Sequence, residues 1–179
     1  LILSKQQNDF FLFSEKIKKT YIKYPTYKIF RNLYRIFRIR KIIKNKNPDL
    51  IISLTSGPNV ISILANLFLE TKLIVTEHTY PPLEKLGFFK RLLKKYIYYF
   101  ATTVIVLTKE SQNWIVNNTY SKDIRVINNP IEYPIQNLNP YKKPPDSSNK
   151  FILNCGRLHY EKGQDMLITA FSLIEKDFP

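Results

Sequence analysis

The sequence is short of the residues that build metal centres and disulfide frameworks. Its 179 residues include one cysteine, Cys155, and two histidines, His78 and His159. A disulfide scaffold and a cysteine-rich zinc site are therefore excluded, and no histidine cluster is available for a metal. The low cysteine content is typical of a reducing compartment. No basic segment precedes an apolar core of the kind that a signal peptide has.

Acidic residues and uninterrupted apolar runs are also scarce. The chain has 14 Asp and Glu against 28 Lys and Arg, a net charge of +14. This excludes an acidic binding protein and indicates an anionic partner: nucleic acid, a phosphorylated substrate or a membrane surface. The stretch Leu50–Leu69 has no charge, but Gly57, Pro58 and Asn59 interrupt it. It therefore favours a strand, a turn and a helix over a membrane span.

Apolar segments alternate in type along most of the chain. Short continuous apolar runs predict strands at 49–54, 72–76, 103–107 and 124–127. Between them, periodicity predicts helices at 60–70, 86–100 and 109–117. Alternation of this kind indicates βαβ units and a parallel sheet covered on both faces. The predicted fold class is α/β, with a doubly wound, Rossmann-like first domain.

A proline-rich stretch divides the chain. Five of the eleven prolines lie within 128–150, which predicts a linker because proline removes backbone donors. We expect a first domain at 1–128, a linker at 129–150 and the start of a second domain at 151–179, with a strand at 151–155 and a helix from about Lys162. Because Leu1 is no initiator and Leu1–Ser4 reads as the end of an apolar strand, we interpret the chain as a piece of a longer protein whose first domain lacks its start.

The sharpest motif is the turn Asn154–Asp165. A predicted strand ends, Gly156 allows the backbone to turn, and Arg157 and Lys162 flank the start of a helix. Helix N-termini attract phosphate, and an Arg fork with a Lys point charge would add to that attraction. The motif is neither a Walker loop nor GxGxxG. An ordinary strand-to-helix turn with two solvated cations is the alternative.

These segments resemble family 4 glycosyltransferases, which have the two-Rossmann-domain architecture called GT-B. The resemblance is carried by 151–158, Glu161-Lys162-Gly163 and 165–171, and upstream by 47–53, 75–78, 104–108 and 126–131. It implies that Arg157 and Lys162, with Gly156 as a backbone position, hold the diphosphate of a nucleotide-sugar. It also implies that Glu77-His78 faces the cleft near the transferred sugar, with His78 catalytic. A histidine that caps the strand or bonds a loop carbonyl is the alternative.

The resemblance implies a retaining glycosyltransferase of the hexosyltransferase type. It would transfer sugar from a nucleotide-sugar to a lipid-linked or polysaccharide acceptor, in the synthesis of lipopolysaccharide, capsule or exopolysaccharide. No cofactor or metal is expected. The family's early glycine-rich loop and later Glu-x7-Glu element are not in this sequence, so we expect this fragment alone to be inactive. The expected location is cytoplasmic, at the inner face of the cell membrane.

Two basic, aromatic helices are left over from this assignment. Lys28, Arg31, Arg35 and Arg38 recur at helical spacing among aromatic residues, and 86–100 repeats the theme. One interpretation is a helix that packs its apolar stripe on the sheet. Another is docking on an anionic membrane. Nucleic-acid binding is a third interpretation. No signature of a nucleic-acid-binding module accompanies the charge, and we expect no nucleic-acid partner. A non-catalytic binding module and an inactive remnant remain the alternative functions.

Overall fold

The computed structural model describes residues 2–4, 14–22, 28–84, 86–130 and 152–175. The chain divides into two compact units, Leu1–Ile131 and Glu132–Pro179. Each is described by itself. The predicted linker lies outside the described residues, apart from Asn129 and Pro130.

The first unit is built on a parallel sheet of four strands. These are β3 (Leu50–Leu54), β4 (Lys72–Glu77), β5 (Thr103–Val106) and β6 (Ile124–Val126), in the order β3-β4-β5-β6. Ser53 pairs with Val75, and Val75 pairs with Val104. The four strands predicted from the sequence are confirmed, as is the α/β class.

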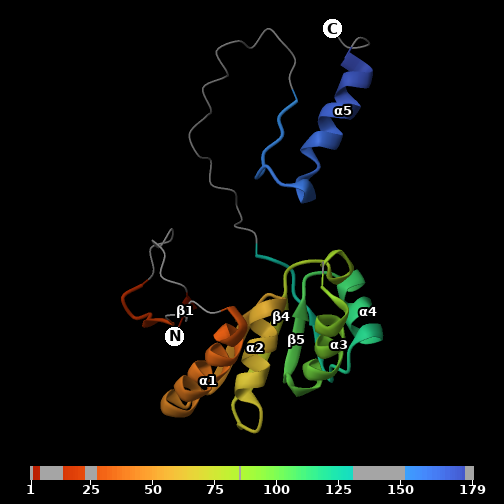
Figure 1. The fold of residues 1–179 in the computed structure, drawn as a ribbon. Coiled ribbons are helices and arrows are strands. Elements are labelled where there is room, and N and C mark those ends of the chain that lie inside the picture. The colour runs from red at the N-terminus through yellow and green to blue at the C-terminus, as the bar shows by residue number, and fades with distance from the viewer. Residues whose placement is uncertain (1, 5–13, 23–27, 85, 131–151, 176–179) are drawn as a thin grey trace. The chain divides into compact units, whose positions relative to one another are not determined.

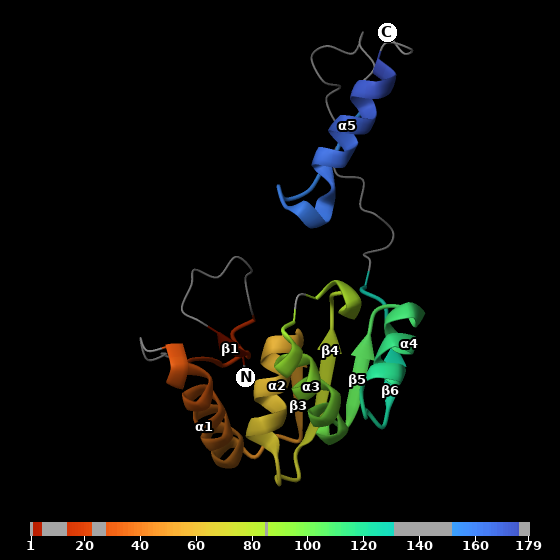
Figure 2. The ribbon, with the colours of Figure 1, turned by 45° about the vertical axis from the view of Figure 1, so that its right-hand side comes forward.

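The helices that connect these strands share one face of the sheet (Figures 1 and 2). They are α2 (Ser56–Asn66), α3 (Phe88–Ile97) and α4 (Lys109–Asn118), with short 3₁₀ turns η1 (Pro81–Leu83) and η2 (Tyr98–Phe100). The strand order advances in one direction, and right-handed crossovers then place every helix on the same side. On the other side Leu50, Ile52 and Leu54 are exposed. Among the described elements, helices therefore cover one face of the sheet rather than both faces as predicted from the sequence.

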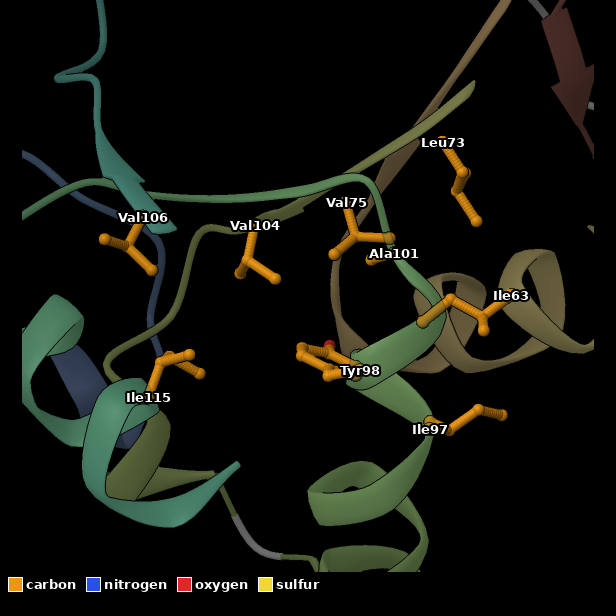
Figure 3. Packing of buried hydrophobic residues seen from close by; sticks show 9 residues of the cluster. All are labelled: Ile63, Leu73, Val75, Ile97, Tyr98, Ala101, Val104, Val106 and Ile115. Carbon is orange, nitrogen blue, oxygen red and sulfur yellow. The ribbon is translucent and has the colours of Figure 1, made fainter. Parts of the chain in front are cut away.

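The core lies between the sheet and these three helices (Figure 3). Leu73 and Val75 of β4 and Val104 and Val106 of β5 point toward the helical layer. On the helical side they meet Ile63 of α2, Ile97 of α3, Tyr98 of η2, Ala101 directly after η2, and Ile115 of α4. All nine are buried, so apolar burial here fixes the sheet against the helices.

Helices α2 and α4 each begin shortly after a strand, at a residue that local sequence determines. Helix α2 begins at Ser56, four residues earlier than predicted, because Pro58 falls in its first turn, where a missing N–H costs nothing. Thr55, just before it, has φ 71°, which is strained for a β-branched residue. Helix α4 is capped by Thr108, whose hydroxyl accepts from the Ser111 backbone N–H at 3.2 Å.

The amino-terminal segment of the first unit adds a two-stranded sheet and one helix. Strand β1 (Ile2–Ser4) pairs in parallel with β2 (Lys19–Tyr21), and α1 (Lys28–Lys46) packs on α2. The Arg40 guanidinium donates to the carbonyl oxygens of Ala65 and Leu67, at 3.0 and 2.6 Å, and so caps the end of α2. Among the described residues, no helix has both the length and the apolar character needed to cross a bilayer.

The second unit contains η3 (Tyr160–Lys162) and α5 (Gln164–Ile174). The strand predicted at 151–155 is not formed at 152–155, and Phe151 lies outside the described residues. An apolar run becomes a strand only when its backbone groups find a partner strand, and no described residue of this unit supplies one. The helix predicted from about Lys162 begins at Gln164.

Candidate functional site

A pocket of about 460 Å³ opens at the carboxyl ends of β4 and β5. Its lining comes from the end of β4 and the loop after it, and from the turn into α4: Glu77, His78, Thr79, Tyr80, Leu107, Thr108, Glu110 and Ser111. This is the edge at which open α/β sheets bind their ligands. The structure therefore brings both first-domain candidates, Glu77 and His78, to one pocket.

The two neighbours nevertheless have different surroundings. Side chains alternate across a strand, so Glu77 continues the row of Leu73 and Val75 toward the helical layer, and His78 follows Thr76 on the other side. Glu77 is 2% exposed, whereas His78 is exposed. The His78 Nε2 atom lies 2.9 Å from the Thr76 hydroxyl. Glu77 is thus part of the buried structure beneath the pocket, and His78 is available at its surface.

The carboxylate of Glu77 is held by a lysine that sequence reasoning missed. Lys94 of α3 places its Nζ 3.0 Å from Glu77 Oε1, and both side chains are 2% exposed. The same Nζ lies 3.1 Å from Oε2 of Glu84, in the loop after η1. Burial of an ion pair is costly unless hydrogen bonds satisfy the remaining donors and acceptors. Lys94 meets that condition because it also donates to the Ser56 hydroxyl at 2.8 Å.

Ser56 and Glu84 extend this buried cluster to the start of α2 and to the loop that follows the pocket. Ser56 Oγ lies 2.7 Å from Glu77 Oε2 and 2.7 Å from Glu84 Oε2, so its single proton serves one carboxylate at a time. The loop between β4 and α3 carries His78 and Tyr80, and its later part is fastened through Glu84. The cluster therefore ties the strand end, the helix start and the loop together.

Tyr98 and Asn59 complete the contacts of Glu77. The Tyr98 hydroxyl donates to Glu77 Oε1. Asn59 Nδ2 lies 3.4 Å from the same oxygen, and it also donates to the Thr76 carbonyl oxygen at 2.9 Å. Burial, and next the negative charge of Glu77, raise the pKa of Tyr98 well above its ordinary value. Tyr98 is therefore a neutral donor throughout the physiological range. The cluster thus consists of five buried residues, Ser56, Asn59, Glu77, Lys94 and Tyr98, and of the half-buried Glu84.

The opposite wall of the pocket carries Glu110, in the first turn of α4. A hydrogen bond from its own backbone N–H, and next one from Thr108, lower the pKa of this carboxyl. A carboxylate in a first helical turn occupies the place where an anion would otherwise bind. The pocket thus offers a carboxylate, an imidazole and the aromatic ring of Tyr80, groups suited to hydroxyl-bearing ligands rather than to phosphate.

The second-unit motif forms one compact turn. Gly163 has φ 62°, a left-handed conformation that favours glycine, and immediately precedes α5. The Gln164 side chain donates to the Arg157 carbonyl oxygen at 2.9 Å. A β-carbon at Gly156 would lie 3.7 Å from Lys162 Cγ, so the lysine side chain passes over the glycine. Arg157 and Lys162 are both exposed. Their role in holding a diphosphate stays a prediction.

In the part of the chain that the structure describes, no three His, Cys, Asp or Glu side chains gather in a group that could hold a metal ion.

Comparison with known proteins identifies the family to which the chain belongs. Residues 6–133 match the family model of Glycosyltransferase Family 4, and the chain belongs to that family. It is 29% identical to an uncharacterized glycosyltransferase of Methanocaldococcus jannaschii, over 94% of the chain and 45% of that protein. It is 26% identical to the amylovoran biosynthesis glycosyltransferase AmsD of Erwinia amylovora, over 80% of the chain and 42% of that protein.

A third relative acts on a lipid-linked glycan. The chain is 26% identical, over 84% of its length and 40% of the relative, to the Campylobacter jejuni enzyme named GalNAc-alpha-(1->4)-GalNAc-alpha-(1->3)-diNAcBac-PP-undecaprenol alpha-1,4-N-acetyl-D-galactosaminyltransferase. The chain spans less than half the length of each of these curated relatives. The resemblance found in the sequence is confirmed at the level of the family.

Proposed function

We propose that this chain is part of a glycosyltransferase that moves a sugar from a nucleotide-sugar to a lipid-linked or polysaccharide acceptor. Membership of the family supports the reaction class. The single observation that carries the proposal is the pocket at the ends of β4 and β5, with His78 exposed on it. We place the reacting sugar in this pocket, with His78 as its catalytic contact and Glu77 as the buried residue beneath it.

We assign donor binding to the second-unit turn. Arg157 and Lys162 are exposed cations on a turn that leads into α5, and Gln164 and Gly163 fix the backbone between them. In the proposed reaction they stabilise the departing nucleoside diphosphate, without a metal ion. This is electrostatic stabilisation of the charge that develops on the leaving group. Activity in the presence of a chelator is the expected result.

The experiment is a transfer assay on the full-length protein encoded by the native locus. A panel of nucleotide-sugars is offered with undecaprenyl-diphosphate-linked and free glycan acceptors, and the anomeric configuration of the product is read by ¹H NMR. A retained configuration and loss of turnover in His78→Ala support the proposal. A product of inverted configuration rejects the retaining mechanism, and full turnover in His78→Ala rejects the role of His78.

We further propose that α3 docks on an anionic membrane surface, which would place the enzyme peripherally at the cytoplasmic face of the cell membrane. Most apolar side chains of α3 do not pack on the sheet: Phe88, Phe89, Leu92, Leu93 and Tyr96 are exposed. The inward positions are Lys94 and Ile97. Exposed aromatic rings beside the exposed cations Lys90 and Arg91 suit the headgroup region of an anionic bilayer.

Vesicle flotation tests this docking. Binding to vesicles with phosphatidylglycerol, and not to neutral vesicles, is expected, with loss in Phe88→Ser/Phe89→Ser. Phe68→Ser is the matched control, because Phe68 is 92% exposed and follows α2 rather than lying on α3. Equal binding of both variants rejects the assignment to α3. If an oligonucleotide binds the protein more tightly than the vesicles do and releases it from them, the result would instead favour a nucleic-acid partner.

A further inference from the structure

Thr76 and His78 lie on the same side of the chain at the pocket end of β4. Thr76 is 8% exposed, whereas His78 is exposed on the pocket. The imidazole Nε2 and the threonine Oγ1 are 2.9 Å apart. An imidazole nitrogen and a hydroxyl each have two possible roles in such a bond, so the distance alone does not say which atom donates.

A second contact of Thr76 settles the direction. Its Oγ1 also lies 3.3 Å from the carbonyl oxygen of Ser53, on the neighbouring strand β3. A carbonyl oxygen only accepts, and a hydroxyl has one proton to give. Both bonds are therefore made together only when Thr76 donates to Ser53 and accepts from the N–H at Nε2 of His78. In the neutral ring Nδ1 then carries no proton.

We propose that Thr76 is a positioning residue that holds neutral His78 as the Nε2–H tautomer, so that Nδ1 is the ring nitrogen left for a ligand. An unprotonated nitrogen accepts a hydrogen bond and does not donate one. Nδ1 of His78 is thus fitted to accept a hydrogen bond from a hydroxyl group, such as that of a sugar in the pocket. The identity of that ligand rests on the proposed function; the tautomer and its cause do not.

The tautomer is read directly by long-range ¹H–¹⁵N correlation NMR on this chain labelled with [¹⁵N]histidine, at alkaline pH. The sequence has only two histidines, so His159→Gln assigns the spectrum. A protonated Nε2 and an unprotonated Nδ1 are expected. In Thr76→Val, which keeps the branched shape without the hydroxyl, the two nitrogens should shift toward the averaged values of an unconstrained ring. Thr76→Ser should restore them.

Two NMR results would overturn the inference: a proton on Nδ1 in the unaltered chain, or identical histidine spectra for the unaltered chain and Thr76→Val. The first result does not involve Thr76→Val and so does not depend on how well that variant folds.

Kinetics of the full-length enzyme separate this inference from the proposed function. Loss of one hydrogen bond predicts a fall in kcat/KM of about tenfold in Thr76→Val, with recovery in Thr76→Ser. If His78→Ala is fully active while the NMR tautomer is as expected, the role of His78 fails and the positioning by Thr76 stands. If His78→Ala is inactive but Thr76→Val has normal kinetics, the positioning role fails and the proposed function stands.

Discussion

Lys94 Nζ and Glu77 Oε1 lie 3.0 Å apart with both side chains 2% exposed, directly beneath the pocket that His78 lines. The pair joins α3 to the end of β4, and its neighbours Ser56 and Glu84 add the start of α2 and the loop beyond the pocket. A contact of this kind is costly to break from one side, because the remaining charge stays buried.

Replacement of Lys94 by methionine should destabilise the chain by about 3–5 kcal/mol, because it leaves the carboxylates of Glu77 and Glu84 close together without their cation. Urea unfolding followed by circular dichroism measures the change. Lys90→Met is the matched control, since Lys90 is exposed on the same helix and should cost little. Equal stability of the two variants would show that the buried pair does not hold this region together.

The double variant Glu77→Gln/Lys94→Met tests whether the two charges act as a pair. Glu77→Gln removes the more deeply buried of the two carboxylates that Lys94→Met leaves without a cation, so the double variant should be more stable than Lys94→Met alone. Strictly additive losses, measured by the same unfolding experiment, would mean that the two residues act independently.

Tyr98 makes stability depend on alkaline pH. Its folded pKa is raised, so its contribution is fully present below the unfolded pKa of about 10 and is lost as pH rises through the folded value. At pH 8 the unaltered chain should be more stable than Tyr98→Phe by about 1 kcal/mol, the worth of a typical hydrogen bond. This advantage should shrink above about pH 10. An advantage that stays constant up to pH 11 would contradict the raised pKa.

Glu110 makes folding stability fall as the pH falls, whereas Tyr98 makes it fall as the pH rises. Its folded pKa is lowered, so its contribution is present above the unfolded pKa and is lost as pH falls through the folded value. The unaltered chain should exceed Glu110→Gln in melting temperature at pH 7, and the difference should disappear in strong acid. Glu70→Gln, outside the helices, is the control. A difference that is independent of pH would show that the charge of the Glu110 carboxylate does not stabilise the start of α4.

The strands and most of the helices were predictable because short apolar runs and helical periodicity are local signals. The start of α2 was misplaced because Gly57-Pro58-Asn59 resembles a turn, yet proline is tolerated in a first helical turn. The run 152–155 has strand propensity, but no described residue of the second unit pairs with it. Propensity does not supply a partner strand.

The site was only half predictable for a similar reason. Glu77 and His78 stand at the end of a strand, which the sequence shows, but Lys94 is one of four cations in α3. Its burial follows from its place one turn before Ile97 and Tyr98, on the stripe that faces the core. A lysine on an apolar stripe near a glutamate that ends a buried strand was the available signal. Thr76 gave no signal, because its role depends on contacts across strands.

We propose that this chain contributes a sugar-binding pocket and the diphosphate contacts of a glycosyltransferase. The most direct measurement is the transfer rate of the full-length enzyme with Arg157→Ala or Lys162→Ala. Each variant should lower kcat by about 100-fold or more, as expected when a group that stabilises developing charge is removed. Lys72→Ala is the control, because Lys72 is exposed at the amino end of β4, and the pocket lies at the carboxyl end of that strand. Near-normal turnover in both single variants would contradict the account.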